Sequence, residues 1–453
     1  RMTVFASFKK LFRPKPERLP ERLAACSAVK FKVVVVDFLD NIESSGGENL
    51  ARLLSTQEGL SLSFFDENFP KSFLNLESRT LFDLIDRGQA IIEKTGADVI
   101  IWGYRDNDRI RLNFQTERQY ENEDNAYISL LDSFFFPACF FEHPGQFPSA
   151  ILNLIYGAVI SSLNPVNAAA KIQKRYLLKK IIDKLTKDNS AKAVSVEYMP
   201  YIMNFLGIIY LNYAHDNRDE KDFKITKSLF ETAIKHQDLI TSPLHLGCIY
   251  YHLGQLYDCG TRYMENRPGS YFKGAIEFYR QAQRYLGKYT YPYDYGYISY
   301  RLSHLFFNFW RQKEDIQALR DAVFQLREAE KIYTYALFPD FWAVIQGELG
   351  QMLGLLGNLT KSEDISELAV SCYRNQQKVI TERRDPITWA LAQENIGDIY
   401  YRIGKNSEDR PHLEDALECY HDALYIFENA GNEDKIKNIM TSIARTNQCL
   451  NLI

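Results

Sequence analysis

The pattern of apolar and polar positions divides the chain into two parts with different periods. Up to about residue 125, short apolar runs alternate with amphipathic stretches. A continuous β-branched run such as FKVVVVDF is typical of a buried strand, whereas alternation as in RIRLNFQT is typical of a half-exposed one. Four segments have a strand pattern: residues 31–38, 60–66, 97–104 and 109–116. Two segments have the period of an amphipathic helix: residues 48–55 and 78–96.

The order of these elements predicts a small mixed sheet with helices packed against it. The turn RDND joins the last two strands, so these two form a hairpin. Ser78 or Thr80 can cap the second helix, and Gly96 follows its end. Two aromatic-rich pieces come next, SFFFPACFF at 133–141 and SAILNLIYGAVISSL at 149–163. The second piece predicts a helix that is buried on most sides.

From about residue 195 the chain has a helical pattern, and small residues recur at a fixed spacing, which indicates an internal repeat. One lies at the centre of each first helix of a hairpin: Gly207, Gly254, Ser303, Gly350 and Gly397. Another opens each second helix: Thr226, Ala275, Ala322, Ala369 and Ala416. Four residues after this second set comes a large side chain: Phe230, Tyr279, Leu326, Tyr373 and Tyr420. The repeat length is 47 residues between Gly350 and Gly397.

A glycine in the middle of a helix costs about 1 kcal/mol relative to alanine, so its recurrence needs a compensating interaction. We expect the central small residue to let the second helix approach closely, with the large residue filling the adjoining space. Stacking of hairpins then buries their apolar faces. The extra length is expected between the two helices, where GKNSEDRPHLED (404–415) predicts a polar loop with longer helices as the alternative. Residues 434–453 predict a capping helix.

Composition narrows the class of protein. The chain has 453 residues, too many for one compact core, with 46% hydrophobic and 25% charged residues. The formal net charge of −4 gives no overall field that attracts nucleic acid. The seven cysteines form no C-x-x-C pair, which favours reduced, buried thiols in a cytosolic protein.

The repeat resembles the tetratricopeptide repeat, whose signature is Leu-Gly, an aromatic residue, and then Ala-x3-aromatic-x2-Ala. The first part is carried by Leu206-Gly207 with Tyr210, Leu253-Gly254 with Tyr257, and Ile396-Gly397 with Tyr400. This resemblance implies an all-α, right-handed superhelical solenoid of about five long hairpin repeats. The standard repeat has about 34 residues, and a period of 47 also fits HEAT-like repeats.

The first part resembles the amino-terminal domain of TolB and related domains of curli-assembly and flagellar accessory proteins. The residues that carry this resemblance are VVVVDF at the end of the first strand and GQAIIEKTGADVIIWG from Gly88 to Gly103. Such domains are usually non-catalytic interaction or assembly modules. In some bacterial proteins they precede helical repeats, and the same order is found here.

In tetratricopeptide proteins the groove residues lie three before, one after and five after the central small residue. That rule predicts a groove in which aromatic rings anchor a partner peptide and amides pair with its backbone. The residues predicted to contact a partner are Asn204, Asn212, Tyr251, Gln255, Tyr300, His304, Asn308, Gln351, Glu394 and Arg402. The alternative is that these side chains face water, or that another part of the chain fills the groove.

The first 22 residues combine apolar and basic side chains. Three phenylalanines fall on one face of a helix, and basic residues flank them, which predicts a weak membrane-surface anchor. The residues of this predicted contact are Phe5, Phe8, Lys9, Lys10, Phe12 and Arg13. The alternative is a tail that docks its rings on its own fold or stays disordered. No run reaches the roughly 18 apolar residues of a membrane span.

No sequence motif predicts catalysis, and histidines and cysteines lack metal-ligand spacing. We therefore expect no enzyme activity, no cofactor and no metal. The first hypothesis is a scaffold or adaptor that binds a protein or peptide in the solenoid groove. The alternative is a ligand-sensing regulator whose α/β domain binds a small anion or nucleotide and signals through the solenoid. The Ser-Gly-Gly at 45–47, before a predicted helix, is the candidate anion site for this hypothesis, and a plain β-α turn is the other interpretation of these residues.

The fold class is thus mixed, with a small α/β domain followed by an all-α solenoid. The expected segments are a basic extension, an α/β domain with an aromatic-rich helical end, a linking helix and the solenoid: residues 1–25, 26–165, 166–194 and 195–453. The expected location is cytoplasmic, with possible peripheral attachment on the inner membrane face through residues 1–22.

Overall fold

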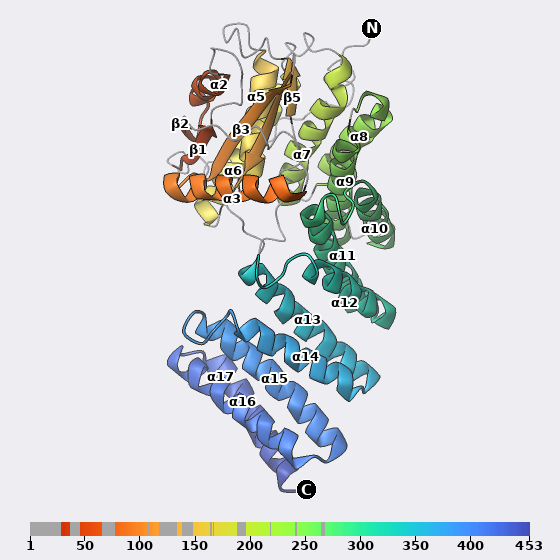
Figure 1. Ribbon diagram of the computed structural model, residues 1–453. Coiled ribbons are helices and arrows are strands. Elements are labelled where there is room, and N and C mark those ends of the chain that lie inside the picture. Colours follow the sequence, from red (N-terminus) through yellow and green to blue (C-terminus); the bar gives the residue numbers. More distant parts are fainter. Residues whose placement is uncertain are drawn as a thin grey trace. The chain divides into compact units, whose positions relative to one another are not determined.

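A computed structural model of the chain shows an α/β region followed by a series of helices (Figure 1). It describes residues 29–36, 46–65, 78–106, 109–116, 134–137, 148–163, 165, 167–187, 196–217, 219–240, 242–263 and 268–453. The chain forms two compact units, Arg1–Tyr291 and Pro292–Ile453. Each unit is described by itself below.

The first unit contains a five-stranded mixed sheet in the order β2-β1-β3-β4-β5. β1 pairs in parallel with β2 and β3, while β3–β4 and β4–β5 are antiparallel. The strands are β1 (Phe31–Val36), β2 (Leu60–Phe65), β3 (Val99–Asp106), β4 (Arg109–Gln115) and β5 (Phe134–Pro137). The four strands predicted from the sequence and the hairpin of the last two are confirmed, and β5 is an addition.

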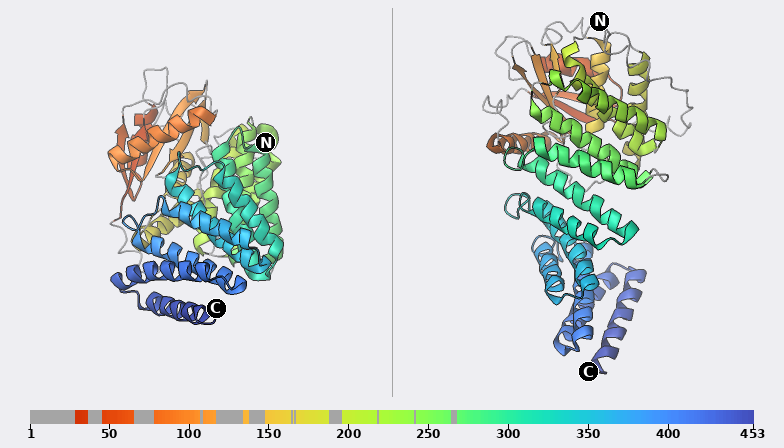
Figure 2. Two further views of the ribbon diagram at one scale, coloured as in Figure 1. Left: turned by 60° about the horizontal axis from the view of Figure 1, so that its bottom comes forward. Right: turned by 90° about the vertical axis from the view of Figure 1, so that its right-hand side faces the viewer.

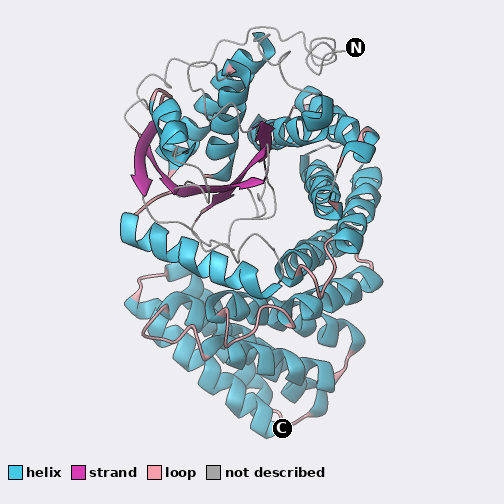
Figure 3. Ribbon diagram, turned by 45° about the horizontal axis from the view of Figure 1, so that its top comes forward, coloured by secondary structure: helices cyan, strands magenta, loops and turns pink. Residues whose placement is uncertain are grey.

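Helices cover both faces of this sheet, as the β-α-β order requires (Figure 3). On one face, Ile91 and Ile92 of α3 (Ser78–Thr95) pack with Val34 and Trp102. On the other face lie α2 (Gly46–Ser55) and α5 (Ser149–Ser162), and α5 is buried on nearly all sides, as its sequence predicted.

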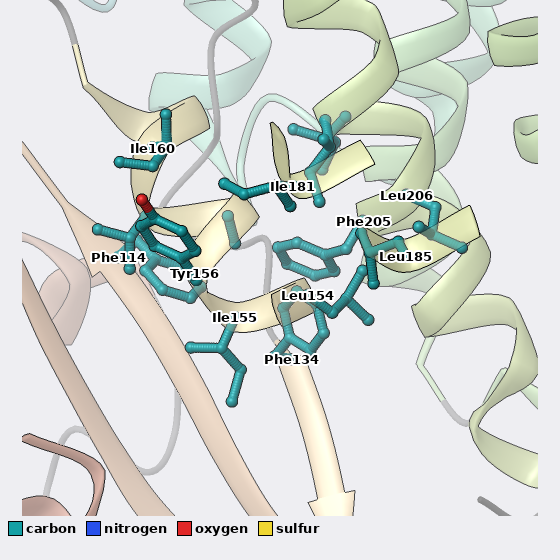
Figure 4. Close-up of a cluster of buried hydrophobic side chains, with 14 of the residues drawn as sticks. Phe114, Phe134, Leu154, Ile155, Tyr156, Ile160, Ile181, Leu185, Phe205 and Leu206 are labelled. Atoms are coloured by element: carbon teal, nitrogen blue, oxygen red, sulfur yellow. The ribbon is translucent and has the colours of Figure 1, made fainter. Parts of the chain in front are cut away.

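The core on the α5 side continues without a break into the first helical hairpin. Phe134 of β5 lies against both Phe114 of β4 and Phe205 of α7 (Met199–Asn217), with ring centroids 6.4 Å and 3.5 Å away (Figure 4). α6 (Ala168–Lys187) buries Leu177 and Ile181 in the same cluster. The segment expected to link two domains is therefore a core helix, because its apolar face has both α5 and α7 to pack against.

The first unit ends with two helical hairpins, α7 with α8 and α9 with α10. The helices that follow α7 in these hairpins are α8 (Glu220–Lys235), α9 (Pro243–Tyr263) and α10 (Pro268–Tyr285). Two short 3₁₀ helices, η5 (Val196–Tyr198) and η6 (Gln237–Leu239), lie before α7 and after α8. In both hairpins the predicted ring lies against the central glycine. A methyl group on Gly207 or Gly254 would overlap the ring of Phe230 or Tyr279, respectively.

The second unit consists of three further hairpins and a final helix, each packed on the next in chain order (Figure 2). The helices are α11 (Pro292–Lys313), α12 (Ile316–Glu330), α13 (Pro339–Thr360), α14 (Glu363–Gln377), α15 (Pro386–Ser407), α16 (Arg410–Asn429) and α17 (Glu433–Leu450). Each first helix begins with a proline. Proline has no backbone N–H, and the N–H groups in the first turn of a helix have no partner within that helix. The predicted last helix is confirmed as α17.

The packing reason that the sequence predicted for the central glycines also holds in this unit. A Cβ atom on Gly350 would lie 2.9 Å from the ring of Tyr373, and one on Gly397 would lie 2.8 Å from the ring of Tyr420. In the hairpin where serine replaces glycine, Ser303, the ring is replaced by Leu326. Where the first helix has serine in place of glycine, the second helix thus has leucine in place of an aromatic ring.

The predicted polar loop at 404–415 is wrong, and the alternative of longer helices is right. α15 continues to Ser407 and α16 begins at Arg410, so only two residues separate them. Glu408 has φ of 52°, and the N–H of Asp409 donates to the carbonyl of Gly404 at 2.9 Å, which closes the turn. Glu314 and Lys361 adopt the same left-handed conformation 94 and 47 residues earlier. The extra repeat length is therefore helical.

None of the helices in the described part of the chain is long and apolar enough to cross a bilayer.

Candidate partner-binding surface

In the first unit, the four residues predicted to contact a partner are all buried: Asn204, Asn212, Tyr251 and Gln255. Asn212 accepts a hydrogen bond from the buried ammonium of Lys174 at 3.2 Å. The same ammonium donates to the carbonyls of Ser161 and Leu163 at the end of α5. Here another part of the chain, α6, covers the predicted groove position.

The pair in the second hairpin is also engaged in packing. Gln255 donates to the hydroxyl of Tyr251 at 3.0 Å, and its carbonyl oxygen lies 3.0 Å from Nδ1 of His252. The His252 ring stacks on Phe230 of the preceding hairpin. These contacts connect two successive hairpins, and they hold both side chains of the pair in the buried interior of the first unit.

In the second unit, the first helices α11, α13 and α15 expose a line of side chains, while about half of their other residues are buried. The open positions include those one and five residues after the central small residue. We call these six residues the first-helix stripe: His304, Asn308, Gln351, Leu355, Asp398 and Arg402. All six are half-exposed or exposed. The stripe is mainly polar and combines amides with charges of both signs.

The positions three residues before the central small residue are less open. Tyr300 is buried and donates its hydroxyl to Oε1 of Glu348 at 2.9 Å. His304 reaches Oε2 of the same carboxylate with Nε2 at 3.1 Å. The Tyr300 ring also packs edge-on against Phe341, with centroids 5.0 Å apart. Two helices, α11 and α13, therefore hold one carboxylate beside the stripe.

Ion pairs connect α15 to α17 at the other end of the stripe. Glu394 lies 2.6 Å from the ammonium of Lys435, and Asp398 lies 3.7 Å from the guanidinium of Arg445. Asp398 also accepts from the Tyr420 hydroxyl at 2.7 Å. The predicted contact residue Glu394 is thus half-buried and paired, whereas Arg402 is half-exposed.

Three of these charged residues were missed from the sequence: Glu348, Lys435 and Arg445. A signal for Arg445 was available, because Ala444 lies 47 residues after Gly397 and places α17 in the register of a first helix. Arg445 then falls one residue after the central position, in line with the stripe. Glu348 could not be predicted in the same way, because the two side chains that hydrogen-bond to it belong to another helix, α11.

The part of the chain that the structure describes contains no group of three or more His, Cys, Asp or Glu side chains that could hold a metal. Cys372 and Cys419 are free and buried, and burial raises the pKa of their thiols to about 11 and about 12. The predicted membrane-contact residues, all between 5 and 13, and the serine of the candidate anion turn lie outside the described residues, whereas Gly46 and Gly47 of that turn begin α2 and are buried.

Comparison with known proteins assigns no family. No protein-family model matches the chain, and no curated protein matches it. What the chain does is therefore inferred from its own residues.

Proposed function

We propose that the chain is a non-catalytic scaffold or adaptor of the tetratricopeptide-repeat type, which binds a partner protein through an extended peptide. The observation that carries the proposal is the first-helix stripe, a line of mainly polar side chains left open on helices that bury about half of their other residues. The resemblance of the repeats to tetratricopeptide repeats, with a right-handed superhelix, makes this stripe the wall of a groove.

The chemistry of the stripe favours a peptide backbone over a small molecule. Asn308 and Gln351 offer amide donors and acceptors on neighbouring first helices. Packed helices lie about 8–10 Å apart, and an extended peptide advances about 3.3 Å per residue. A peptide crossing the stripe would therefore pass about three residues for each hairpin, with amides placed to pair with its backbone.

The α/β region has a supporting role in this proposal. It resembles the TolB amino-terminal and curli-assembly type of domain, which implies an assembly module, and it shares one core with the first hairpin. The basic segment 1–22 is proposed to hold the assembly at the inner face of a bacterial membrane. The chain would then present a partner-binding surface at a cytoplasmic membrane surface.

The experiment that tests this function is co-purification from native lysate followed by mass spectrometry. The intact chain is compared with a triple variant in which Asn308, Gln351 and Arg402 are each replaced by alanine. These residues are half-exposed or exposed, so the fold is expected to tolerate the changes. We expect at least one abundant partner to be lost from the triple variant.

A matched control carries three alanines on exposed positions of second helices, at Arg320, Glu418 and His421. This control is expected to keep the same partners. If the stripe variant and the control retain an identical set of partners, the stripe is not the binding surface.

A further inference from the structure

Three carboxylates lie along the open face of the second unit, and only two have a cationic partner. Glu394 is paired with Lys435, and Asp398 with Arg445. Glu348 has no lysine or arginine within ion-pair distance among the described residues. Its contacts are the hydroxyl of Tyr300 and the imidazole of His304.

Glu348 is nevertheless held in a fixed place. Its side chain is 23% exposed, and each carboxylate oxygen accepts one hydrogen bond, Oε1 from Tyr300 and Oε2 from His304. The Tyr300 ring is itself fixed between His304 and Phe341, with centroids 4.5 Å and 5.0 Å away. The carboxylate is thus oriented before any partner arrives, which reduces the entropy lost on binding.

Half-burial makes this negative charge a strong attractor for a cation. A carboxylate that has lost most of its water interacts with an opposite charge more strongly than one in bulk solvent. It offers about four acceptor sites, of which two are in use here, so each oxygen can accept one further bond. A guanidinium donates two parallel N–H groups and matches that arrangement, whereas an ammonium presents a single point charge.

We propose that Glu348 is the anchor for an arginine side chain of the bound peptide. This inference rests on the proposed function, because it names the partner chemistry of the same surface. Gln351 lies about one helical turn beyond Glu348 on α13. His304 faces Glu348 from α11. The arginine therefore enters between α11 and α13, with the peptide backbone passing along the stripe.

The test uses selection from a displayed library of random peptides of about twelve residues, near pH 8, against the full chain. Glu348→Gln keeps the shape and removes the charge, and Glu418→Gln, on an exposed position of α16, is the control. We expect the intact chain and the control to select peptides enriched in arginine. Glu348→Gln is expected to select peptides without that enrichment.

The affinity of one selected peptide then gives the size of the effect. Glu348→Gln is expected to weaken it about tenfold or more, in the range of a charge-assisted hydrogen bond. Peptides that bind with equal affinity to the intact chain and Glu348→Gln would overturn the inference and leave the proposed function standing. A library that yields no binder to the intact chain would overturn both.

Discussion

Gln376 of α14 occupies the space that a side chain at Gly347 of α13 would need, since a Cβ atom placed there would overlap its amide group. In the neighbouring hairpins the sizes are reversed. The equivalents of Gln376 are alanines, Ala329 and Ala423, and the equivalents of Gly347 are Tyr300 and Glu394. One large and one small residue thus share each such contact, whichever helix supplies the large one.

This exchange predicts the outcome of a double-mutant cycle. Gly347→Ala removes the cost of a mid-helix glycine, about 1 kcal/mol, but it requires the amide of Gln376, the end of a flexible side chain, to move aside. Gly347→Ala is therefore expected to stabilise the chain by about 0.5–1 kcal/mol more when residue 376 is alanine than when it is glutamine. Urea unfolding followed by circular dichroism measures the free energy of unfolding in both backgrounds. An equal effect of Gly347→Ala in the two backgrounds would contradict the prediction.

The left-handed turn residue Lys361 predicts a stabilising change. Its φ of 54° is unfavourable for a residue with a Cβ atom but not for glycine. Lys361→Gly is expected to raise the free energy of unfolding by about 0.5–1 kcal/mol. Lys378, which ends α14 with φ of −64°, is the control, and its replacement by glycine is expected to lower stability. Thermal unfolding of both variants decides the matter, and equal shifts would refute the role of the backbone conformation.

Buried His245 predicts a loss of stability in acid. Burial, and then the nearby charge of Arg111, lower the pKa of His245 to about 3. Neither ring nitrogen has a hydrogen-bond partner among the described residues, and the rings of Phe135 and Tyr201 pack against the imidazole. The unfolded chain binds the proton below about pH 6.5 and the folded chain does not, so stability falls as the pH drops from there toward 3.

When the pH is lowered from 7 to 5, the titration of His245 alone is expected to reduce the free energy of unfolding by about 2 kcal/mol. His245→Phe removes the titrating group and is expected to flatten the pH dependence by that amount. His421→Phe, at an exposed position of α16, should leave it unchanged. Denaturant unfolding of the two variants at both pH values provides the comparison. An unaltered slope in His245→Phe would show that the imidazole is accessible to protons in the folded chain.

His412 predicts a loss of stability as the pH rises, which is opposite to the trend for His245. Burial alone would lower its pKa, but the hydrogen bonds and charges of Asp409 and Glu367 outweigh burial, so the pKa is raised. Its Nε2 lies 3.4 Å from Glu367 of α14, and its ring lies against Tyr400 of α15. The stabilisation is complete below about pH 6.5 and is lost as pH rises through the raised pKa.

The expected size is below about 1 kcal/mol, because the side chains of both carboxylates, Glu367 and Asp409, are exposed by a third or more. Hydrogen exchange of α16 amides between about pH 6 and pH 8, corrected for the intrinsic rate, is the measurement. Opening of α16 is expected to become more frequent as the pH rises, and His412→Gln is expected to abolish that change. A pH dependence that survives in His412→Gln would assign the effect to other groups.

Local patterns predicted much of the fold, and the failures have physical reasons. The strand β1 and the helix α3 were predicted because their periods and end signals are local. β5 has only four residues, Phe134–Pro137, and its apolar run looks the same in a strand, a helix or a loop. The length of α15 was missed because GKNS at 404–407 is polar, and nothing in its composition separates an exposed helix end from a loop.

Repeat register placed residues on the correct helices but did not predict what covers them. Asn308 and Gln351 are open to solvent, whereas Asn212, five residues after its central glycine like Asn308, lies buried against Lys174. The difference arises because α7 packs on α5 and α6, two helices that precede the repeats and do not share their pattern. Periodicity describes one helix at a time, and burial depends on the neighbours that the chain brings to it.

The continuous core between β5 and α7 has a consequence for how such a protein can change over evolutionary time. Phe134 and Phe205 come from the α/β region and the first hairpin, and neither could be exchanged without exposing the other. Recombination at residue 195 would join two halves with unmatched aromatic surfaces. Loss or duplication of hairpins is less costly in the second unit, where α11 to α16 repeat one local contact pattern. Lineages are therefore expected to differ in the number of later repeats while the first hairpin is inherited together with the sheet.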